Sequence, residues 1–154
     1  MDICYVDANG DLHFSYRGEL KSEESVQKFV EDNDILFSLA FGPVLIDNGE
    51  RCEPSRYTLG ELEDPYPRAA LCQRDKLHYL LIAATGEGNH YRFQNIHDFA
   101  KNIATFGCQK AYTIDGGQTI NIVMNNQLIN NVNYSFIKPV SDIIYFATAI
   151  PSKE

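Results

Sequence analysis

Alternating hydrophobic and polar residues at the start of the chain predict a β-hairpin. Residues 3–7 and 12–17 alternate on either side of Asn9-Gly10, a pair typical of a tight turn between antiparallel strands. A helical pattern then begins after Ser22, the expected N-cap, and ends at Asn33-Asp34. The apolar face expected for this helix consists of three residues: Val26, Phe29 and Val30.

The most hydrophobic segment, residues 35–46, is interrupted by Gly42-Pro43. Because the residue before a proline is pushed out of the helical region, this pattern predicts a strand, a kink and a second strand. Residues 50–67 have the composition of a long loop, and a second hairpin is expected from residues 68–74 and 77–84.

A second helix is expected after Asn95, which forms a capping pair with Asp98. Its expected core face consists of four residues: Ile96, Phe99, Ile103 and Phe106. Gly107 is a suitable stop, and a strand over residues 109–114 follows. Three further strands are expected: residues 119–124, a short strand around Leu128-Ile129, and Asp142 to Ala149.

These elements indicate the α+β class with a mixed, largely antiparallel sheet or sheets and two main helices, because strict β-α-β alternation is missing. The 154 residues suit a single domain, and 44% hydrophobic with 22% charged residues indicates a globular chain. The net charge of −8 argues against nonspecific binding to nucleic acid or anionic membranes. No apolar run reaches membrane-spanning length, and the N-terminus does not resemble a signal peptide.

The four cysteines lie far apart in the sequence: Cys4, Cys52, Cys72 and Cys108. No C-x-x-C pair is present, which excludes the usual zinc spacings, and we expect no metal site of that kind. The cysteines could form two disulfides, but the pattern favours small buried hydrophobic residues or isolated thiols.

The candidate functional stretch is centred on Asp115, where an apolar strand stops at an acid, two glycines and a hydroxyl residue. Gly116 and Gly117 permit another group to approach the backbone closely, and Thr119 offers a hydroxyl near the acid. Taken alone, the stretch is more typical of a hairpin turn. Asp115 could also hold a divalent cation, although the sequence has no dense run of acidic ligands.

Several segments, in this order, resemble the phosphodiester glycosidase domain family over residues 37–149. Residues 42–49 resemble the family's Gly-Pro-Leu-Leu/Val-x-x-Gly segment, and Arg68 opens a strand of small and apolar residues as the family pattern does. Residues 113–120 stand in the place of Asn-Leu-Asp-Gly-Gly-Gly-Ser-Ser, and residues 138–144 approximate Arg-Pro-Val-x-(Asp/Asn)-x-Ile.

The chain also departs from the family pattern. The changed positions are Thr113 for Asn, Gln118 for the third Gly, Thr119-Ile120 for the Ser pair, and Cys72 for the usual Gly after the arginine strand. The family's N-terminal Asn-Gly-x-(Phe/Tyr)-Phe type motif is not found before residue 35. We therefore expect residues 1–154 to form one phosphodiester-glycosidase-like domain that lacks the family's N-terminal segment.

The resemblance implies hydrolysis of the glycosidic bond in a sugar-1-phosphodiester, such as an N-acetylglucosamine-1-phosphodiester, or in a related glycan. A carboxylate stabilises the oxocarbenium-like transition state, and an arginine fork suits the phosphate. The catalytic residues implied are Asp115 and, as the phosphate clamp, Arg68. The substrate-binding residues implied are Gly116, Gly117, Thr119 and Gly42. No cofactor is expected.

Alternatives remain at several positions. A second carboxylate, if one is used, would be Glu87 or Asp47, and both are also typical turn residues. Arg51, Arg56 and Arg74 could add a basic patch or form a salt-bridged loop with nearby acids. The alternative function is a non-catalytic carbohydrate- or phosphoglycan-binding or accessory domain, which the departures from the pattern favour. The family includes bacterial relatives in exopolysaccharide work, and its members mostly act outside the cytoplasm, whereas this chain carries no export signal.

Overall fold

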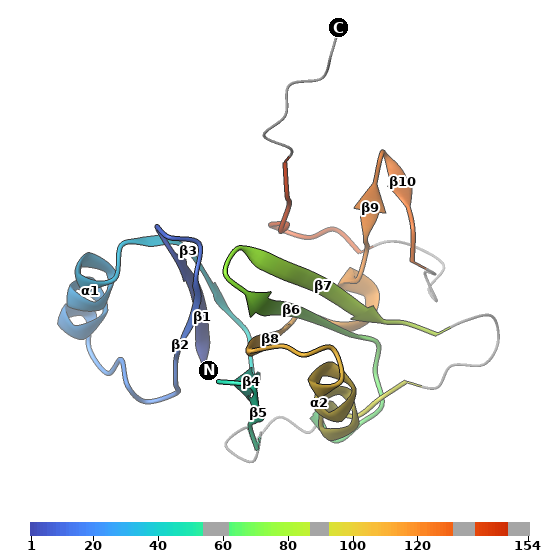
Figure 1. Cartoon of the computed structure of the whole chain (residues 1–154), viewed down its shortest axis with the longest axis horizontal. Helices are drawn as coiled ribbons and strands as arrows, with labels where there is room; N and C mark the ends of the chain where they lie inside the picture. Colours follow the sequence, from blue (N-terminus) through green and yellow to red (C-terminus); the bar gives the residue numbers. More distant parts are fainter. Residues whose placement is uncertain (54–61, 87–92, 131–137, 148–154) are drawn as a thin grey trace, which may run out of the picture.

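A computed structural model of the chain describes residues 1–53, 62–86, 93–130 and 138–147. Within these ranges, antiparallel sheets and two α-helices form the α+β fold expected from the sequence (Figure 1). Two sheets make up the body of the molecule, and a small hairpin and an extended segment lie at its C-terminal side. None of the helices described is long and apolar enough to cross a membrane.

The N-terminal sheet has the strand order β2-β1-β3. Its strands are β1 (Ile3–Asp7), β2 (Leu12–Ser15) and β3 (Ile35–Ala40), all paired antiparallel. The predicted hairpin is confirmed, and Gly10 takes the positive φ of 77° that its turn requires. β3 lies at the edge of this sheet, which leaves one side of its backbone outside the ladder.

Helix α1 (Glu23–Asp32) connects β2 to β3. Ser22 caps it as predicted, because its side chain accepts a hydrogen bond from the backbone N–H of Ser25. Val26 and Val30, of the apolar face expected for this helix, are exposed. Phe29 contacts the sheet, where it meets the Tyr5 ring edge-on at 5.0 Å between centroids.

The second sheet has the order β5-β4-β8-β6-β7, with antiparallel pairing throughout. Its strands are β4 (Val44–Asp47), β5 (Glu50–Arg51), β6 (Arg68–Asp75), β7 (His78–Ala84) and β8 (Lys110–Ile114). β6 and β8 are central, and Ala69 pairs with Ile114. The start of β6 therefore lies beside the end of β8, where the Asp115 stretch begins.

Helix α2 (Ile96–Ala104) covers one face of this sheet (Figure 1). Asn95 caps it by accepting from the Asp98 N–H, as predicted. Phe99 and Ile103 are buried against β4 and β6, but Phe106 is 46% exposed. The prediction for Phe106 is wrong because the helix ends at Ala104, so residue 106 is in the following turn.

The opposite face of the second sheet packs against the N-terminal sheet. The cluster between them consists of six buried residues: Cys4, Val6, Leu12, Val44, Leu71 and Tyr112. Polar bonds join the same sheets, since the Gln73 amide oxygen accepts from the Leu12 N–H at 2.7 Å. The two sheets and α2 thus form three packed layers.

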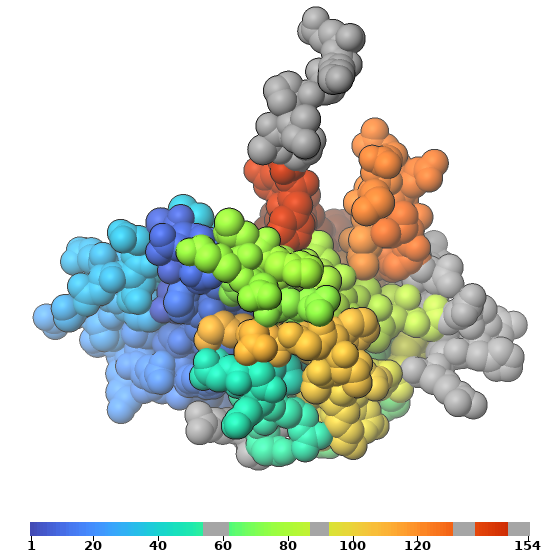
Figure 2. All heavy atoms as spheres, in the orientation of Figure 1, coloured from blue at the N-terminus to red at the C-terminus, as the bar shows by residue number. Residues whose placement is uncertain are grey.

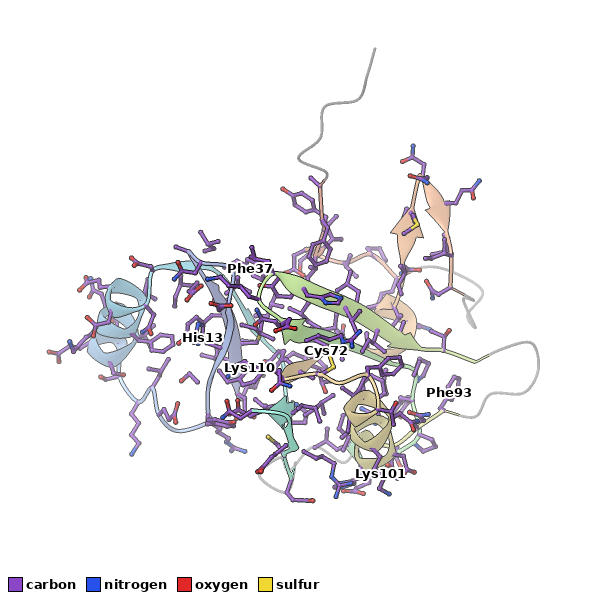
Figure 3. The ribbon with its side chains drawn as sticks, viewed as in Figure 1. His13, Phe37, Cys72, Phe93, Lys101 and Lys110 are labelled. Atoms are coloured by element: carbon purple, nitrogen blue, oxygen red, sulfur yellow. A yellow bond between two sulfur atoms is a disulfide. The ribbon has the colours of Figure 1, made fainter. Side chains whose placement is uncertain are left out.

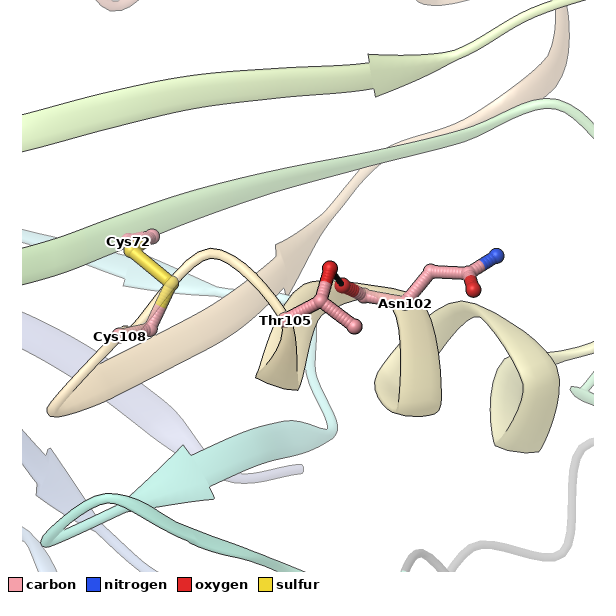
Figure 4. The surroundings of a disulfide bond; sticks show 4 residues. All are labelled: Cys72, Asn102, Thr105 and Cys108. Carbon is pink, nitrogen blue, oxygen red and sulfur yellow. Dashed lines mark hydrogen bonds between the residues drawn. A yellow bond between two sulfur atoms is a disulfide. The ribbon is translucent and has the colours of Figure 1, made fainter.

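Cys72 and Cys108 form a disulfide, which corrects the sequence expectation for these two cysteines (Figure 4). The bond joins β6 to the loop before β8, across 36 residues of sequence. Cys4 is buried and Cys52 half-buried, and both are free thiols, as the sequence favoured.

The predicted C-terminal strands are only partly present. Residues 119–124 do not form one strand, because Gly117–Thr119 form a 3-10 turn and β9 contains only Val123–Met124. β9 pairs with β10 (Gln127–Leu128) across Asn125 and Asn126, whose positive φ values suit a tight hairpin turn. The described part of the predicted last strand, residues 142–147, is not in a sheet, and residues 148 and 149 lie outside the described residues.

Candidate functional site

A cavity of about 500 Å³ lies where β3, the β6–β7 hairpin and the end of β8 meet the C-terminal segments. β3 contributes Ser38 to its wall, and the chain after β8 contributes Asp115 and Thr119. Residues 120–122 and 138–144 form its remaining sides. Figure 2 shows segment 138–147 standing over β7, apart from the β9–β10 hairpin.

The Asp115 side chain is exposed at the end of β8 and lines this cavity. Its Oδ1 atom accepts a hydrogen bond of 2.8 Å from the Gly116 N–H, which holds the carboxylate against the turn. The stretch is not the hairpin turn that local sequence favours, because the chain enters a 3-10 turn instead.

Both glycines after Asp115 are required by the backbone. A Cβ on Gly116 would lie 2.6 Å from the carbonyl oxygen of Pro67, which is closer than any real contact. Gly117 has a φ of 65° and donates its N–H to the same oxygen at 3.0 Å. The group that approaches the glycine backbone closely is therefore Pro67, just before β6. Its contact with the two glycines fixes the Asp115 loop beside Arg68.

Arg68 begins β6 and is only 7% exposed. Its guanidinium donates to three main-chain carbonyl oxygens, those of Gln94 at 3.1 Å, Leu62 at 3.3 Å and Asp64 at 2.8 Å. Arg68 is not among the residues that line the cavity. The structure thus places the backbones of Arg68 and Asp115 at neighbouring strand ends, while the guanidinium holds the 62–64 segment and Gln94 together.

The other two predicted site residues flank the cavity. The Thr119 hydroxyl lines it and donates to the carbonyl of Gly116 at 2.8 Å. Gly42, with a φ of 81°, lies between the cavity residue Phe41 and Pro43. The Pro43 carbonyl accepts from the Thr113 N–H at 3.1 Å, so the Gly42-Pro43 bend is tied to β8.

Several polar residues in the cavity wall were not selected as site residues from the sequence, and three of them carry a charge or a side-chain amide. Lys138 is the cation among the described lining residues, and it occupies the position of the arginine in the family's terminal motif. Asp142 and Asn121 are the other two. The buried Asn121 Oδ1 has no hydrogen-bond partner within the described part of the chain, while the amide nitrogen donates to the Thr119 carbonyl at 3.3 Å.

Asp47, a candidate second carboxylate, lies at the opposite end of β8 from Asp115. It accepts from Lys110 Nζ at 2.9 Å and from the Tyr16 hydroxyl at 2.7 Å. Burial acts to raise the pKa of Asp47, but the hydrogen bonds and the lysine charge together hold it below its usual value. The same interactions explain the raised pKa of Tyr16, where burial is the largest cause and the bond to Asp47 adds to it.

Among the remaining candidates, Arg51 is in an ion pair, Arg74 is exposed at the end of β6, and two others lie outside the described residues. Arg51 pairs with Glu53 at 3.3 Å, in line with a salt-bridged loop. Glu87 and Arg56 lie outside the described residues. Among the described residues, no group of three or more His, Cys, Asp or Glu side chains is placed to hold a metal ion.

Comparison with known proteins identifies relatives of this fold. The catalytic domain of zebrafish N-acetylglucosamine-1-phosphodiester alpha-N-acetylglucosaminidase, auto-inhibited by its pro-peptide, superposes with a TM-score of 0.65 at 17% identity, covering 86% of this chain and 45% of that one. A hypothetical protein from Synechocystis superposes with a TM-score of 0.58 at 13% identity, covering 85% and 31%. The chain thus spans less than half of either structure, and both likenesses show the fold alone.

The family assignment comes from sequence. No curated protein matches the chain. A sequence model described as phosphodiester glycosidase matches residues 5–147, nearly the whole chain and including the N-terminal sheet. The chain belongs to the phosphodiester glycosidase family.

Proposed function

We propose that this protein hydrolyses the glycosidic bond of a sugar-1-phosphodiester, of the N-acetylglucosamine-1-phosphodiester type or a related glycan. The observation that carries the proposal is that Asp115 and Lys138 line one cavity of about 500 Å³. A carboxylate and a cation are the two charges that this reaction needs, one for the sugar and one for the phosphate. The volume lies in the usual range for small-ligand sites.

Asp115 is the proposed catalytic carboxylate. Cleavage at the anomeric carbon develops positive charge on the sugar ring, and a nearby carboxylate stabilises that charge or attacks the carbon. The hydrogen bond from the Gly116 N–H supports this role because it fixes one carboxylate oxygen before substrate arrives. Because Oδ1 is held, the same hydrogen bond also restricts the position of the second carboxylate oxygen, Oδ2.

Phosphate recognition is assigned to Lys138 and Arg68. A phosphate leaving group is already stable as an anion, so a cation beside it can replace a strong general acid. Lys138 supplies that charge from the cavity wall. Arg68 is carried over from the family pattern as the phosphate clamp, and its bonds to three carbonyl oxygens give it a positioning role as well.

Sugar recognition is assigned to the polar groups between these charges. Asn121 Oδ1, which has no hydrogen-bond partner among the described residues, is a suitable acceptor for a sugar hydroxyl or an N-acetyl N–H. Thr119 and Ser38 line the same cavity; the Thr119 hydroxyl already donates to the Gly116 carbonyl and can accept, while the Ser38 hydroxyl can donate or accept. Gly116, Gly117 and Gly42 shape the backbone around them.

The alternative is a carbohydrate- or phosphoglycan-binding domain without catalysis. Thr113 stands where the family pattern has Asn, and it is 2% exposed with a hydroxyl that has no hydrogen-bond partner in the described residues. Ile120 stands where the pattern has Ser and is 6% exposed. The first change replaces an amide with a hydroxyl and the second removes a hydroxyl, so the polar surroundings of Asp115 are altered, which favours binding without turnover.

A paired experiment separates the two functions. Binding of N-acetylglucosamine 1-phosphate is measured by calorimetry, and release of N-acetylglucosamine from its methyl phosphodiester is measured by chromatography. The enzyme binds the first and hydrolyses the second, whereas the binding domain only binds. K138A should weaken binding by about tenfold, while K76A, at the exposed tip of the β6–β7 hairpin, should not. Neither binding nor turnover in the wild type would refute both functions.

A further inference from the structure

We infer that the group esterified to the phosphate is a long apolar chain, so that the substrate class is a glycosyl-phospholipid. This inference rests on the proposed function and adds the aglycone to it. Its basis is a second cavity of about 640 Å³ between the two sheets and segment 142–146. The walls of this cavity are largely apolar and aromatic, with Val6, Phe37, Leu39, Leu71, Tyr79 and Phe146 among them.

The two cavities adjoin, because they share part of their walls. Five residues line both of them: Ser38, Leu39, Asp142, Ile143 and Ile144. One end of the resulting groove presents Asp115 and Lys138, and the other end presents hydrocarbon and aromatic rings. A ligand that fills the groove must therefore carry a polar, anionic head and an apolar tail.

The segment that follows Lys138 sets the direction of the tail. Lys138 lines the polar end, and the same segment continues to Tyr145 and Phe146 at the apolar end. A phosphate held at Lys138 has its sugar on the Asp115 side. Its second ester substituent is then directed along residues 142–146, into the apolar cavity.

The apolar side chains of segment 142–146 are largely exposed to solvent. Ile143 and Tyr145 are each 75% exposed, and Phe146 is 60% exposed. Soluble monomers rarely leave such a continuous apolar surface open without a binding role. Phe37 on β3 is 43% exposed and lies beside the β6–β7 hairpin, where it closes the opposite wall (Figure 3).

The floor of the apolar cavity is already built. The Tyr79 hydroxyl donates to the carbonyl of Gly10, which fixes the ring between the two sheets. Phe146 stacks over that ring in a tilted arrangement, with 6.1 Å between centroids. Tyr79 and Leu71 therefore form a fixed apolar wall of the cavity. Segment 142–146 forms the facing wall, and an apolar tail would fill the space between them.

A series of alkyl esters of N-acetylglucosamine 1-phosphate tests the inference. The methyl, butyl and octyl esters are compared below their micelle-forming concentrations. Burial of each methylene is worth about fourfold in affinity, so kcat/KM should rise at least 100-fold from methyl to octyl, chiefly through KM. Equal kcat/KM for all three esters would overturn the inference and leave the proposed hydrolysis intact.

Matched variants locate the effect. Y145S/F146S should flatten the chain-length dependence and leave hydrolysis of the methyl ester unchanged. V123S is the control, because Val123 is 63% exposed on β9 and lines neither cavity. Unchanged chain-length dependence in Y145S/F146S, with thermal melting as for the wild type, would contradict the proposed tail site.

A binding measurement keeps the inference separate from catalysis. Octyl phosphate should bind the wild type, perturb tyrosine fluorescence, and bind at least tenfold more weakly to Y145S/F146S. This result would support the tail site even if no phosphodiester is hydrolysed. A dimer of the ligand-free protein in sedimentation experiments, dissociated by Y145S/F146S, would instead assign the groove to a second copy and overturn the inference.

Discussion

The guanidinium of Arg68 joins two separate segments of backbone to the start of β6 through three carbonyl oxygens. Two carbonyls come from the 62–64 segment and one from Gln94, just before the cap of α2. Pro67, the preceding residue, accepts the Gly117 N–H and so positions the Asp115 loop. A change at Arg68 therefore reaches the Asp115 loop through the neighbouring Pro67.

R68K retains the charge but loses the planar fork. We expect melting to occur at a lower temperature, by an amount that corresponds to about 1–2 kcal/mol, because carbonyl bonds are lost. We also expect KM for the methyl phosphodiester to rise. Thermal melting and steady-state kinetics check both effects. Lower stability with an unchanged KM would assign Arg68 to positioning alone and remove it from phosphate recognition.

Asp47 gives a prediction on acid stability. Its pKa is lowered in the folded protein, so its contribution to stability is complete above the unfolded value of about 3.9 and is lost as pH falls through the folded value. D47N should therefore be less stable than the wild type at pH 7, by about 1–2 kcal/mol. Urea unfolding between about pH 7 and pH 3 should show this difference shrinking with acid. A difference independent of pH would contradict the account.

At the scale of elements, local signals were predictable and long-range partners were not. Ser22 and Asn95 cap their helices as expected, because capping depends on residues three positions away. The Cys72–Cys108 bond was missed because its partners meet only when β6 and β8 pair. Residues 142–147 have strand composition, but no described strand pairs with them, and composition carries no information on partners.

The residues of the candidate site also divide into those that a local motif predicts and those that only the tertiary structure brings together. Asp115 and its glycines were found from a contiguous motif, and the structure adds the reason that Gly116 has no side chain. Lys138 and Asn121 join the cavity only through tertiary structure. The position of Lys138 in the family's terminal motif was the one signal that could have selected it.

The disulfide provides a prediction at this scale. Closing a loop of 36 residues restricts the unfolded chain and is worth about 3–4 kcal/mol. The C72S/C108S variant should lose roughly this stability in urea unfolding. Thiol titration of the unfolded wild type should find two reactive thiols before reduction and four afterwards. Four thiols without reductant would contradict the bond.

At the scale of the whole molecule, Tyr112 joins the two sheets. It is fully buried on β8, donates its hydroxyl to the Asp2 carbonyl at 2.7 Å, and accepts from the Phe41 N–H at 2.7 Å. The cavity lies along the same junction, since Phe41 is in its wall. The relative position of the sheets therefore determines the shape of the groove.

Y112F removes this hydroxyl and leaves the ring. We expect a loss of about 1–3 kcal/mol, because one buried and one partly buried backbone group lose a partner, with unfolding still in one transition. Y145F, at an exposed position, is the control and should unfold like the wild type. Urea unfolding followed by circular dichroism checks the difference. Equal stability of Y112F and Y145F would show that this junction contributes little.

The proposed reaction depends most directly on the Asp115 carboxylate. D115N replaces one carboxylate oxygen with an amide NH2 group and keeps the size of the side chain. Because the side chain is exposed, the fold should be unaffected. The decisive measurement is the rate at which wild type and D115N release N-acetylglucosamine from its methyl phosphodiester, with thermal melting as the control for folding. We predict turnover by the wild type and a loss of at least 1000-fold in D115N, with unchanged melting. Full activity in D115N would contradict the assignment of the catalytic carboxylate.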